Sequence, residues 1–526
     1  MKNTGMNRRQ FLNRSLAAGV GASFAIAGTK SSGRVLGAND TIRVAIAGLN
    51  GRGGSHVGSC LEIPGVEIAY LVDPDTRVFK KRIKQIEEGG KTAPRTVQDV
   101  RRALDDKNVD VVSIATPNHW HSLMTIWGCQ AGKDVYVEKP CSHNIHEGRI
   151  AVDAARKYNR IVQHGTQSRS DKHWALTAEI IRSGKLGKLQ VSRALCYKNR
   201  ASIGIKPNTE APAELDYSLW LGPATDHPFN ANYVHYNWHW FWDFGNGDIG
   251  NQGVHQMDIA RWMIPDSSSP GGSATYPKSV LSLGGRFGYT DQGETPNTQI
   301  SVMDYGPVQL IFEVRGLPSK PLLGEGVGNI AHLEAGAIVG GKTFIPKGKT
   351  EGVPLKDLGI KAEADVTRGP GGSKQAHYAN FIEAVRSRKT DDLNADILEG
   401  HYSSALCHLA NISYRLGRPV PFNEKAKAFG DDKDAYETID RMEEHLGKDH
   451  GLNLDGMTYN LGRKLSFDGA TETFAGSPAP IGRRLSSPRS SPERSARRLC
   501  KPVRRRPSSH RRTALPRSAR VSRPPL

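Results

Sequence analysis

The sequence has few cysteines, and none of the six forms a C-x-x-C pair. This pattern excludes a disulfide framework and argues against a structural zinc site. The sequence also lacks a run of eighteen apolar residues, which a membrane-spanning helix needs. With 526 residues, of which 37% are hydrophobic, the chain is long enough for two or three domains with sizeable cores.

Net charge is also missing from the middle of the chain, although the whole chain carries a formal charge of +19. Residues 1–38 contain six basic and no acidic residues, and residues 477–526 contain fourteen Arg, one Lys and one Glu. The remaining residues, 39–476, are therefore nearly neutral. A nucleic-acid-binding protein needs a basic face within its fold, so we expect no nucleic-acid partner.

The two ends are predicted to lie outside the fold. Asn7-Arg8-Arg9-Gln10-Phe11-Leu12 is a twin-arginine sequence, and a short apolar stretch at Ser15–Ala27 follows it. This pattern predicts a signal for the twin-arginine export machinery, a periplasmic location and no membrane span in the mature form; a disordered basic leader is the alternative. The Arg/Ser/Pro-rich residues 477–526 predict a disordered tail, either a polyanion-binding arm or, as we favour, a non-native ending.

A glycine-rich turn follows a predicted buried strand at Thr41–Ala47. Gly48 and Gly53 match the first and third glycines of G-x-G-x-x-G, whereas Asn50 stands at the middle position. Asn tolerates left-handed backbone angles, and a neighbouring glycine permits close approach of a phosphate to the backbone. The turn can therefore hold a pyrophosphate at the N-terminus of the next helix. The residues expected to contact it are Gly48, Asn50, Gly51, Arg52 and Gly53.

An acidic residue follows the next predicted strand, since Val66–Val72 ends at Asp73. A carboxylate about twenty residues beyond the glycine turn accepts hydrogen bonds from the adenosine ribose, which favours NAD over its 2′-phosphorylated relative. The alternative for Asp73 is a helix cap before Thr76–Glu88. Strands and helices then alternate, which predicts a doubly wound parallel sheet over residues 39–165. The later elements of this alternation are Val109–Ala115, Trp120–Ala131, Asp134–Val137, Ile145–Tyr158 and Ile161–His164.

Two strand ends carry a more specific pattern. One runs into Thr116-Pro117-Asn118-His119-Trp120-His121 and the next into Glu138-Lys139-Pro140. With the glycine turn and Asp73, these segments resemble the family of glucose–fructose oxidoreductase, inositol dehydrogenase and MocA-like proteins (Gfo/Idh/MocA), from residue 41 to about 421. The resemblance implies an α/β fold, in which an NAD-binding Rossmann domain precedes an α+β domain with a large, mostly antiparallel sheet. In that family the second domain carries the substrate and often makes an oligomer contact, so we expect a homo-oligomer.

The resemblance also implies roles for single residues. Lys139 would point into the active site beside the nicotinamide ribose and the substrate hydroxyl, where an ammonium can stabilise a developing alkoxide. A surface lysine before a proline turn is the alternative. The implied cofactor contacts are Thr116, Pro117, Asn118, His121, Glu138, Lys139 and Gln167. Arg169 is a candidate for a sugar hydroxyl, with a plain loop role as the alternative. His119 and His121 lack a carboxylate-rich partner motif, so we expect no metal.

The second half contains an aromatic cluster at Tyr236–Asp243, which includes Trp238 and Trp240. Aromatic faces stack on the C–H faces of sugars, so these two residues predict either a carbohydrate platform or an aromatic core cluster. Strands at Gln299–Met303 and Val308–Val314 suit the large sheet, and helical spacing extends over residues 377–386 and 395–416.

His255 opens a predicted helix. In many relatives a D-x-x-x-H pattern at this place supplies an acid–base pair, which makes His255 a candidate catalytic and substrate residue; a capping or core histidine is the alternative. Asn251 stands here in place of the Asp, and a neutral amide can orient an imidazole or a hydroxyl but cannot take a proton. Asp248 and Asp258 are the candidate substitutes for the missing carboxylate.

These predictions combine into five segments: a leader (1–38), a Rossmann domain (39–165), a substrate and oligomerisation domain (166–425), a C-terminal segment (426–476) and a tail (477–526). The expected function is an exported oxidoreductase that moves hydride between tightly bound NAD and a hydroxyl or keto carbon of a sugar or cyclitol. Export implies tight binding because little free NAD exists outside the cytoplasm. One alternative is a redox-neutral NAD-dependent glycosidase, with His255 as the base near sugar C2. A non-catalytic ligand-binding protein of the same fold is the other.

Overall fold

A computed structural model describes residues 41–266, 274–360, 374–424 and 427–475. The predicted leader and the predicted Arg-rich tail lie outside the described residues. None of the helices in these four ranges is both long and apolar enough to cross a membrane.

Six parallel strands form the first sheet, in the order β3-β2-β1-β4-β5-β6. This is the predicted doubly wound sheet, and its strand order reverses between β1 and β4, where open α/β sheets bind ligands. The short strand β3 is the one strand of this sheet that the sequence patterns did not indicate. The strands are β1 (Ile42–Ala47), β2 (Val66–Val72), β3 (Arg95–Val97), β4 (Val111–Ile114), β5 (Asp134–Val137) and β6 (Val162–His164).

Helices cover both faces of this sheet because alternate strand residues are apolar on each side. Val44 and Ile46 face one apolar cluster, and Ala45 and Ala47 face the other. The first cluster includes α2 (Gly53–Glu62), α3 (Phe79–Glu88) and the distant α11 (Lys374–Ser387). The second includes α4 (Val100–Leu104), α5 (Asn118–Gln130) and α6 (Ile145–Lys157). Burial of each large apolar side chain stabilises the folded state by about 1.5–3 kcal/mol. The two clusters together therefore hold the sheet, and the edge that carries the site, in a fixed position.

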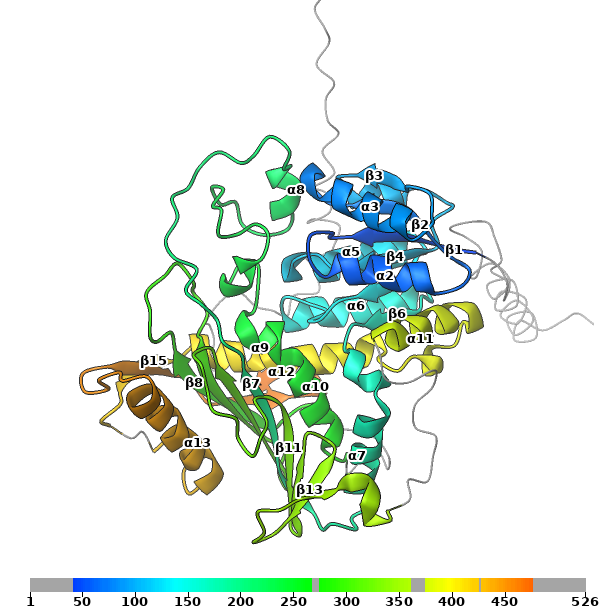
Figure 1. The fold of residues 1–526 in the computed structure, drawn as a ribbon. Coiled ribbons are helices and arrows are strands. Elements are labelled where there is room, and N and C mark those ends of the chain that lie inside the picture. The colour runs from blue at the N-terminus through cyan, green and yellow to red at the C-terminus, as the bar shows by residue number, and fades with distance from the viewer. Residues whose placement is uncertain (1–40, 267–273, 361–373, 425–426, 476–526) are drawn as a thin grey trace, which may run out of the picture. The chain divides into compact units, whose positions relative to one another are not determined.

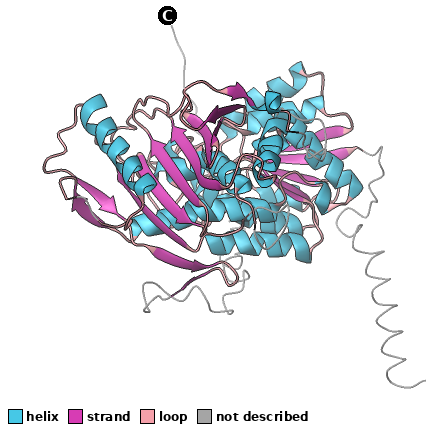
Figure 2. Cartoon of the chain, turned by 90° about the horizontal axis from the view of Figure 1, so that it is seen from below, coloured by secondary structure: helices cyan, strands magenta, loops and turns pink. Residues whose placement is uncertain are grey.

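Twelve strands form the second sheet, which Figure 2 shows beside the helix-rich first domain. Its pairs are antiparallel except for β7 with β10, in agreement with the predicted mostly antiparallel sheet. The strands are β7 (Leu189–Tyr197), β8 (Ser279–Gly285), β9 (Thr298–Asp304), β10 (Gln309–Arg315), β11 (Val327–Leu333), β12 (Gly336–Val339), β13 (Thr343–Pro346), β14 (Val353–Pro354), β15 (Arg418–Pro421), β16 (Thr458–Leu461), β17 (Leu465–Asp468) and β18 (Thr473–Ala475).

One face of the second sheet packs on α7 (Lys172–Arg182), α10 (Gly253–Met263) and α12 (Ile397–Arg415), and the other packs partly on α13 (Lys433–Glu444). Within the predicted C-terminal segment (426–476), the described residues 427–475 supply α13 and the strands β16, β17 and β18 of this sheet, and β16 pairs with β8 and β15. The short helices are η1 (Thr76–Val78), η2 (Gln167–Ser170), η4 (Leu355–Leu358), η5 (Thr390–Asp392) and η6 (His445–Asp449).

Residues 198–246, here called the roof segment, connect β7 to α9 (Gly247–Asn251) and contain α8 (Tyr217–Leu221) and η3 (Asn237–Trp240). Figure 1 shows α8 beside α3 of the first domain. Main-chain hydrogen bonds join the residues just before α8 to the start of η1: the Thr76 N–H donates to Glu214 O at 3.0 Å, and the Asp216 N–H donates to Pro74 O at 2.9 Å. The segment's own core, which includes Trp220 and Phe244, holds it in this place.

Candidate active site

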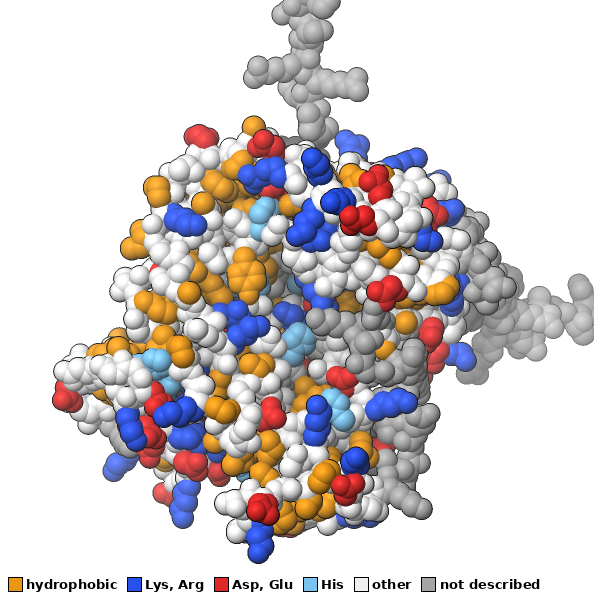
Figure 3. Space-filling model, in the orientation of Figure 1, with side chains coloured by type: hydrophobic (Ala, Val, Ile, Leu, Met, Phe, Trp, Pro, Cys, Tyr) orange, Lys and Arg blue, Asp and Glu red, His pale blue; other side chains and the backbone are white. Residues whose placement is uncertain are grey.

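A cavity of about 640 Å³ lies where the carboxyl ends of the first sheet's strands meet the roof segment and α10. Figure 3 shows basic and histidine side chains in the hollow between the upper and lower parts of this face. The wall includes every residue of the predicted glycine turn except Gly53, together with residues of the two specific strand ends. The cavity is therefore at the ligand-binding edge of a doubly wound sheet.

The glycine turn has the geometry of a phosphate cradle. Gly48 has φ +85°, and a Cβ there would lie 2.5 Å from Ala115 O, so only glycine fits. A Cβ on Gly51 would meet nothing within 4 Å, which leaves room above the turn. Helix α2 begins at Gly53 without a capping side chain or an acidic residue in its first turn. Its N-terminus is thus suited to a phosphate.

Asp73 lies in the cavity wall with 5% of its surface exposed. Its carboxylate accepts the Leu49 N–H at 2.8 Å and the Asp75 N–H at 3.0 Å, so it is fixed beside the glycine turn. Burial raises its pKa, and these hydrogen bonds oppose that change. The alternative role as a helix cap belongs to Asp75, whose side chain accepts the Arg77 N–H at 3.0 Å.

Glu138 is the centre of a buried polar cluster. Its Oε1 accepts Arg52 Nε at 2.7 Å and Gln167 Nε2 at 3.2 Å, and it lies 3.2 Å from His56 Nε2. Burial alone would raise the pKa of this carboxyl, but the Arg52 charge and the His56 contact bring it well below its usual range. Glu138 is therefore ionised, and it holds Arg52 and Gln167 against the cavity.

Lys139 lines the cavity at the next position, as the resemblance implied. Its Nζ donates to the main-chain oxygen of Asn251 at 2.6 Å. Burial lowers the pKa of the Lys139 ammonium, and the neighbouring Glu138 carboxylate opposes that shift. Asn251 thus positions Lys139 through its main-chain oxygen. The Asn251 side-chain amide, which stands where a carboxylate was expected, does not make this contact.

His255 lines the same cavity from α10. Burial, followed by the charge of Lys139, lowers its pKa to about 3, so its ring is neutral near pH 7. Neither candidate substitute carboxylate serves it. Asp248 accepts Arg200 Nε at 2.8 Å and Nη2 at 2.7 Å, and Asp258 accepts the Ser403 hydroxyl at 2.6 Å and pairs with Arg169.

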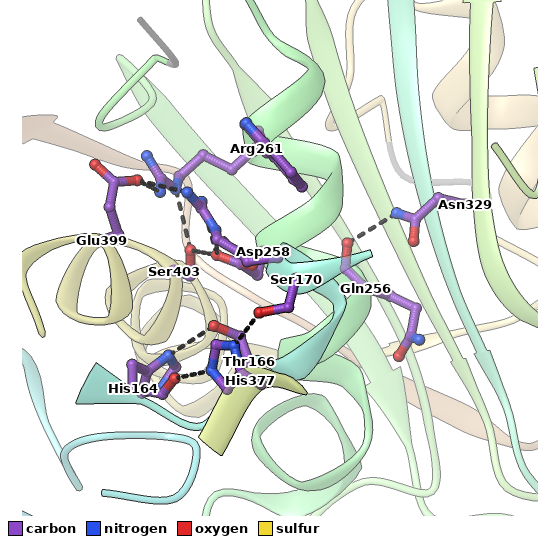
Figure 4. Close-up of polar contacts among 12 residues, drawn as sticks. His164, Thr166, Ser170, Gln256, Asp258, Arg261, Asn329, His377, Glu399 and Ser403 are labelled. Atoms are coloured by element: carbon purple, nitrogen blue, oxygen red, sulfur yellow. Dashed lines mark hydrogen bonds and ion pairs between the residues drawn. The ribbon is translucent and has the colours of Figure 1, made fainter. Parts of the chain in front are cut away.

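Arg169 does not reach the cavity, contrary to its predicted substrate role. Its Nε lies 2.9 Å from Asp258 Oδ2 and its Nη1 lies 3.1 Å from Glu399 Oε2. Figure 4 shows the surrounding network, in which Arg261 also donates to Glu399 and Ser403 to Asp258. The guanidinium is fully engaged by two carboxylates, so its role is to join η2 to α10 and α12.

The Thr116–His121 segment lines the cavity as predicted, with Thr116, Pro117, Asn118 and His121 in its wall. His121 is buried, with Nδ1 2.6 Å from Pro140 O and Nε2 2.8 Å from Thr116 O. It therefore joins the two specific strand ends. His119 is also buried, beside Trp220 O at 3.1 Å. No group of metal-ligating side chains occurs among the described residues.

The two predicted platform residues have different surroundings. Trp238 lines the cavity and stacks on His239 with ring centres 3.6 Å apart. Trp240 is buried outside the cavity wall, under the Arg200 guanidinium at 5.2 Å. Both tryptophans are buried, and Trp238 is the one that also contributes to the cavity wall.

Several cavity residues come from places that the motifs did not indicate. His235 Nε2 lies 2.8 Å from Asp75 Oδ2, and Trp120 Nε1 donates to Trp220 O at 3.0 Å. These contacts fasten the roof segment over the cavity. They had no local signal in the sequence, because the partners are more than 90 residues apart. Other cavity residues of this kind include Pro74, Gln98, Asp99, Leu219, Gln252 and Gln256, whereas Tyr236 and His239 belong to the predicted aromatic cluster.

Comparison with known proteins agrees with this geometry. Residues 42–166 match the Gfo/Idh/MocA family described as "Oxidoreductase family, NAD-binding Rossmann fold". Residues 180–272 and 361–446 match that family's "C-terminal alpha/beta domain". The matched ranges together cover more than half of the chain. The chain belongs to the Gfo/Idh/MocA oxidoreductase family. Its cofactor is accordingly NAD, and the phosphate cradle and fixed Asp73 fit that dinucleotide.

Individual relatives are distant. A glycosyl hydrolase family 109 protein of Shewanella pealeana is 28% identical over 31% of this chain and 37% of its own length. A levoglucosan dehydrogenase of Pseudarthrobacter phenanthrenivorans is 25% identical over 40% of this chain and 48% of its own length. The matches thus span less than half of either relative.

Solved structures support the fold. The WlbA dehydrogenase of Chromobacterium violaceum, in complex with NADH and UDP-GlcNAcA, superposes with a TM-score of 0.54 at 19% identity, over 72% of this chain and 96% of that one. A levoglucosan dehydrogenase with NADH and levoglucosan gives 0.51 at 15% identity, over 70% of this chain and 96% of that one.

Proposed function

We propose that this protein is an exported oxidoreductase that moves hydride between tightly bound NAD and a hydroxyl or keto carbon of a sugar or cyclitol. The observation that carries the proposal is the presence of Lys139 and His255 in one cavity with the glycine turn and Asp73. A cofactor cradle and two side chains suited to act on a hydroxyl group thus share one cavity. The oxidation of a sugar hydroxyl needs both.

NAD, when bound, supplies a hydride acceptor or donor. Gly48, Gly51 and the N-terminus of α2 would hold its pyrophosphate, and Asp73 its adenosine ribose. Glu138 and Gln167 would face the nicotinamide half, since both line the wall next to Lys139. The basic residues in the cavity wall are Arg52 and Lys139, and Arg52 is paired with Glu138. Neither of these two side chains is paired with Asp73, and the imidazole near it, His235, is paired with Asp75, so a carboxylate faces the adenosine ribose, which favours NAD.

Lys139 and His255 divide the work on the substrate hydroxyl. One N–H of the Lys139 ammonium donates to Asn251 O, which leaves two for a substrate oxygen. Because Asn251 fixes its direction, the ammonium is prepared to stabilise negative charge on that oxygen. The His255 ring is neutral near pH 7, so one ring nitrogen has a lone pair that can accept a hydrogen bond from the substrate hydroxyl; its pKa of about 3 makes it a weak base, and Lys139 carries the larger part of the charge stabilisation.

The roof segment supports the tight binding of NAD. It forms part of the cavity wall and is fastened to the first domain by His235 with Asp75 and by Trp220 with Trp120. Release of the dinucleotide would require these contacts to open. A His235→Ala substitution removes one fastening, so we expect it to speed NAD loss on dialysis, whereas His450→Ala, at a partly exposed histidine outside the cavity wall, should not.

The direct test is a panel of sugars and cyclitols added to NAD-loaded protein under single-turnover conditions, with NADH absorbance at 340 nm as the signal. We expect at least one compound to reduce the bound NAD, and Lys139→Met to abolish the reduction while NAD stays bound. Absence of reduction by every compound, with NAD demonstrably present, would contradict the dehydrogenase proposal.

A redox-neutral glycosidase is the second candidate, and two observations favour it. Glycosyl hydrolase family 109 proteins are among the relatives, and the acid–base position next to His255 carries Asn251 instead of Asp. An aryl glycoside and its 2-deuterated form separate the two functions. Aglycone release with deuterium loss at C2 supports the glycosidase, whereas net NADH formation supports the dehydrogenase.

Export and assembly are further parts of the proposal. Replacement of both Arg8 and Arg9 by Lys should keep the protein in the cytoplasm if the twin-arginine machinery carries it. Light scattering coupled to gel filtration should give the mass of a homo-oligomer. Export of the Arg8 and Arg9 double variant to the periplasm would contradict the twin-arginine route. A monomeric mass would contradict the homo-oligomer.

A further inference from the structure

Six large apolar side chains are exposed in the described part of the chain, and Tyr236 is the one that also lines the cavity. About half of its surface, 51%, is exposed. An exposed aromatic ring at the opening of a binding cavity is costly in water and is favoured when a ligand covers it. The position of Tyr236 thus differs from that of the other exposed apolar residues.

The Tyr236 ring is held in place although it is exposed. Its hydroxyl accepts Arg200 Nη1 at 3.1 Å. Arg200 in turn is fixed by two hydrogen bonds to the buried Asp248, at 2.8 and 2.7 Å. The ring centre lies 4.7 Å from that of His239, whose Nδ1 lies 2.6 Å from Tyr236 O. A ring ordered in advance binds a flat partner with little loss of conformational entropy.

The contacts of Tyr236 connect it to Lys139. Asp248 and Asn251 belong to the same short helix, α9, and Asn251 accepts the Lys139 ammonium. His239 lines the cavity, and the Lys139 charge is among the causes that lower its pKa. Tyr236 therefore lies on the outer side of the substrate compartment, with Lys139 on its inner side.

We propose that Tyr236 is the platform of a second subsite, which binds a ring joined through a glycosidic bond to the sugar that reacts at Lys139. This inference rests on the proposed function and narrows its substrate class from free monosaccharides to glycosides. The occupant is a flat-faced ring, a second sugar or an aryl aglycone, because a half-exposed phenol ring offers a π-face and no charge.

The test measures binding by calorimetry to NAD-loaded protein with pairs of methyl and 4-nitrophenyl glycosides of glucose, galactose and N-acetylglucosamine. For the sugar that binds, we expect the nitrophenyl glycoside to bind about tenfold more tightly than the methyl glycoside. Tyr236→Ala should remove that difference and leave the methyl glycoside unchanged. Tyr236→Phe, which keeps the ring, should keep most of it.

Ile205→Ala is the matched control, since Ile205 lies in the same roof segment, is 73% exposed and does not line the cavity. It should leave both affinities unchanged. Replacement of the nitrophenyl group by a glucosyl group distinguishes a sugar from an aryl occupant. Equal affinity within every pair, or an equal loss for both members in Tyr236→Ala, would overturn the inference and leave the oxidoreductase proposal intact. Failure of every glycoside to bind, with NAD present, would instead contradict the sugar substrate itself.

Discussion

The glycine turn offers a substitution that separates cofactor binding from folding. Gly51 is exposed, its added Cβ would meet nothing within 4 Å, and its backbone is outside the left-handed region. Gly51→Ala should therefore leave the free energy of unfolding unchanged or raise it by about 0.4–1 kcal/mol, because alanine restricts the unfolded chain. The same methyl group would occupy the space where the pyrophosphate approaches the turn.

A methyl group forced into a well-packed contact costs about 1–3 kcal/mol. In the free energy of NAD binding, this cost corresponds to a loss of affinity of roughly 5- to 150-fold. Calorimetry on protein freed of dinucleotide measures this loss, and urea unfolding measures stability. Gly58→Ala is the matched control, since Gly58 lies within α2 and its Cβ would make only an ordinary 3.8 Å contact with Gln85. It should gain stability and keep the affinity.

Gly48→Ala gives the opposite pattern. Its φ of +85° and the 2.5 Å approach to Ala115 O predict a loss of at least about 2 kcal/mol in the free energy of unfolding. The argument would be refuted if Gly51→Ala bound NAD as tightly as the unchanged protein, because the space above the turn would then hold no phosphate.

Three further predictions follow from the site and its surroundings. Lys139→Met should lower kcat at least about 100-fold with the NAD content of the protein unchanged; a loss of NAD would show a role in binding instead. Arg169→Met should cost about 3–5 kcal/mol in urea unfolding, since Asp258 and Glu399 lose a buried partner; a cost below about 1 kcal/mol would contradict that role. Acid should destabilise the fold, because burial lowers the pKa of histidines such as His119 and His408 to about 3. Unfolded histidines bind protons below about pH 6.5, so each such group removes about 2 kcal/mol of stability between pH 7 and pH 5; a melting temperature that does not fall over that range would contradict the neutral buried rings.

Local patterns predicted the first domain well. The glycine turn, the strand before it and the helix after it are consecutive in the chain, so periodicity and turn chemistry were enough to place Gly48, Gly53 and Asp73 at one edge. The two strand ends that resemble the family likewise brought Lys139 and the Thr116–His121 segment to the cavity. The short strand β3 escaped because three residues, Arg95–Val97, carry no measurable alternation.

Residues whose roles depend on distant partners could not be predicted. Arg169 looked like a substrate contact, yet its nearest carboxylate, Asp258, is 89 positions away in the chain. The roof segment has no pattern that shows it crossing to Asp75, since that contact spans 160 positions. Asn251 illustrates a third limit: its identity suggested a side-chain role, whereas its backbone oxygen does the positioning.

The most direct test of the account is a crystal structure of the protein with NAD. We predict that the pyrophosphate lies on the Gly48–Gly53 turn, that the adenosine ribose faces Asp73 and that the nicotinamide ring lies next to Lys139, beneath the roof segment. A dinucleotide bound elsewhere, or a cavity that holds no dinucleotide at saturating NAD, would contradict the account.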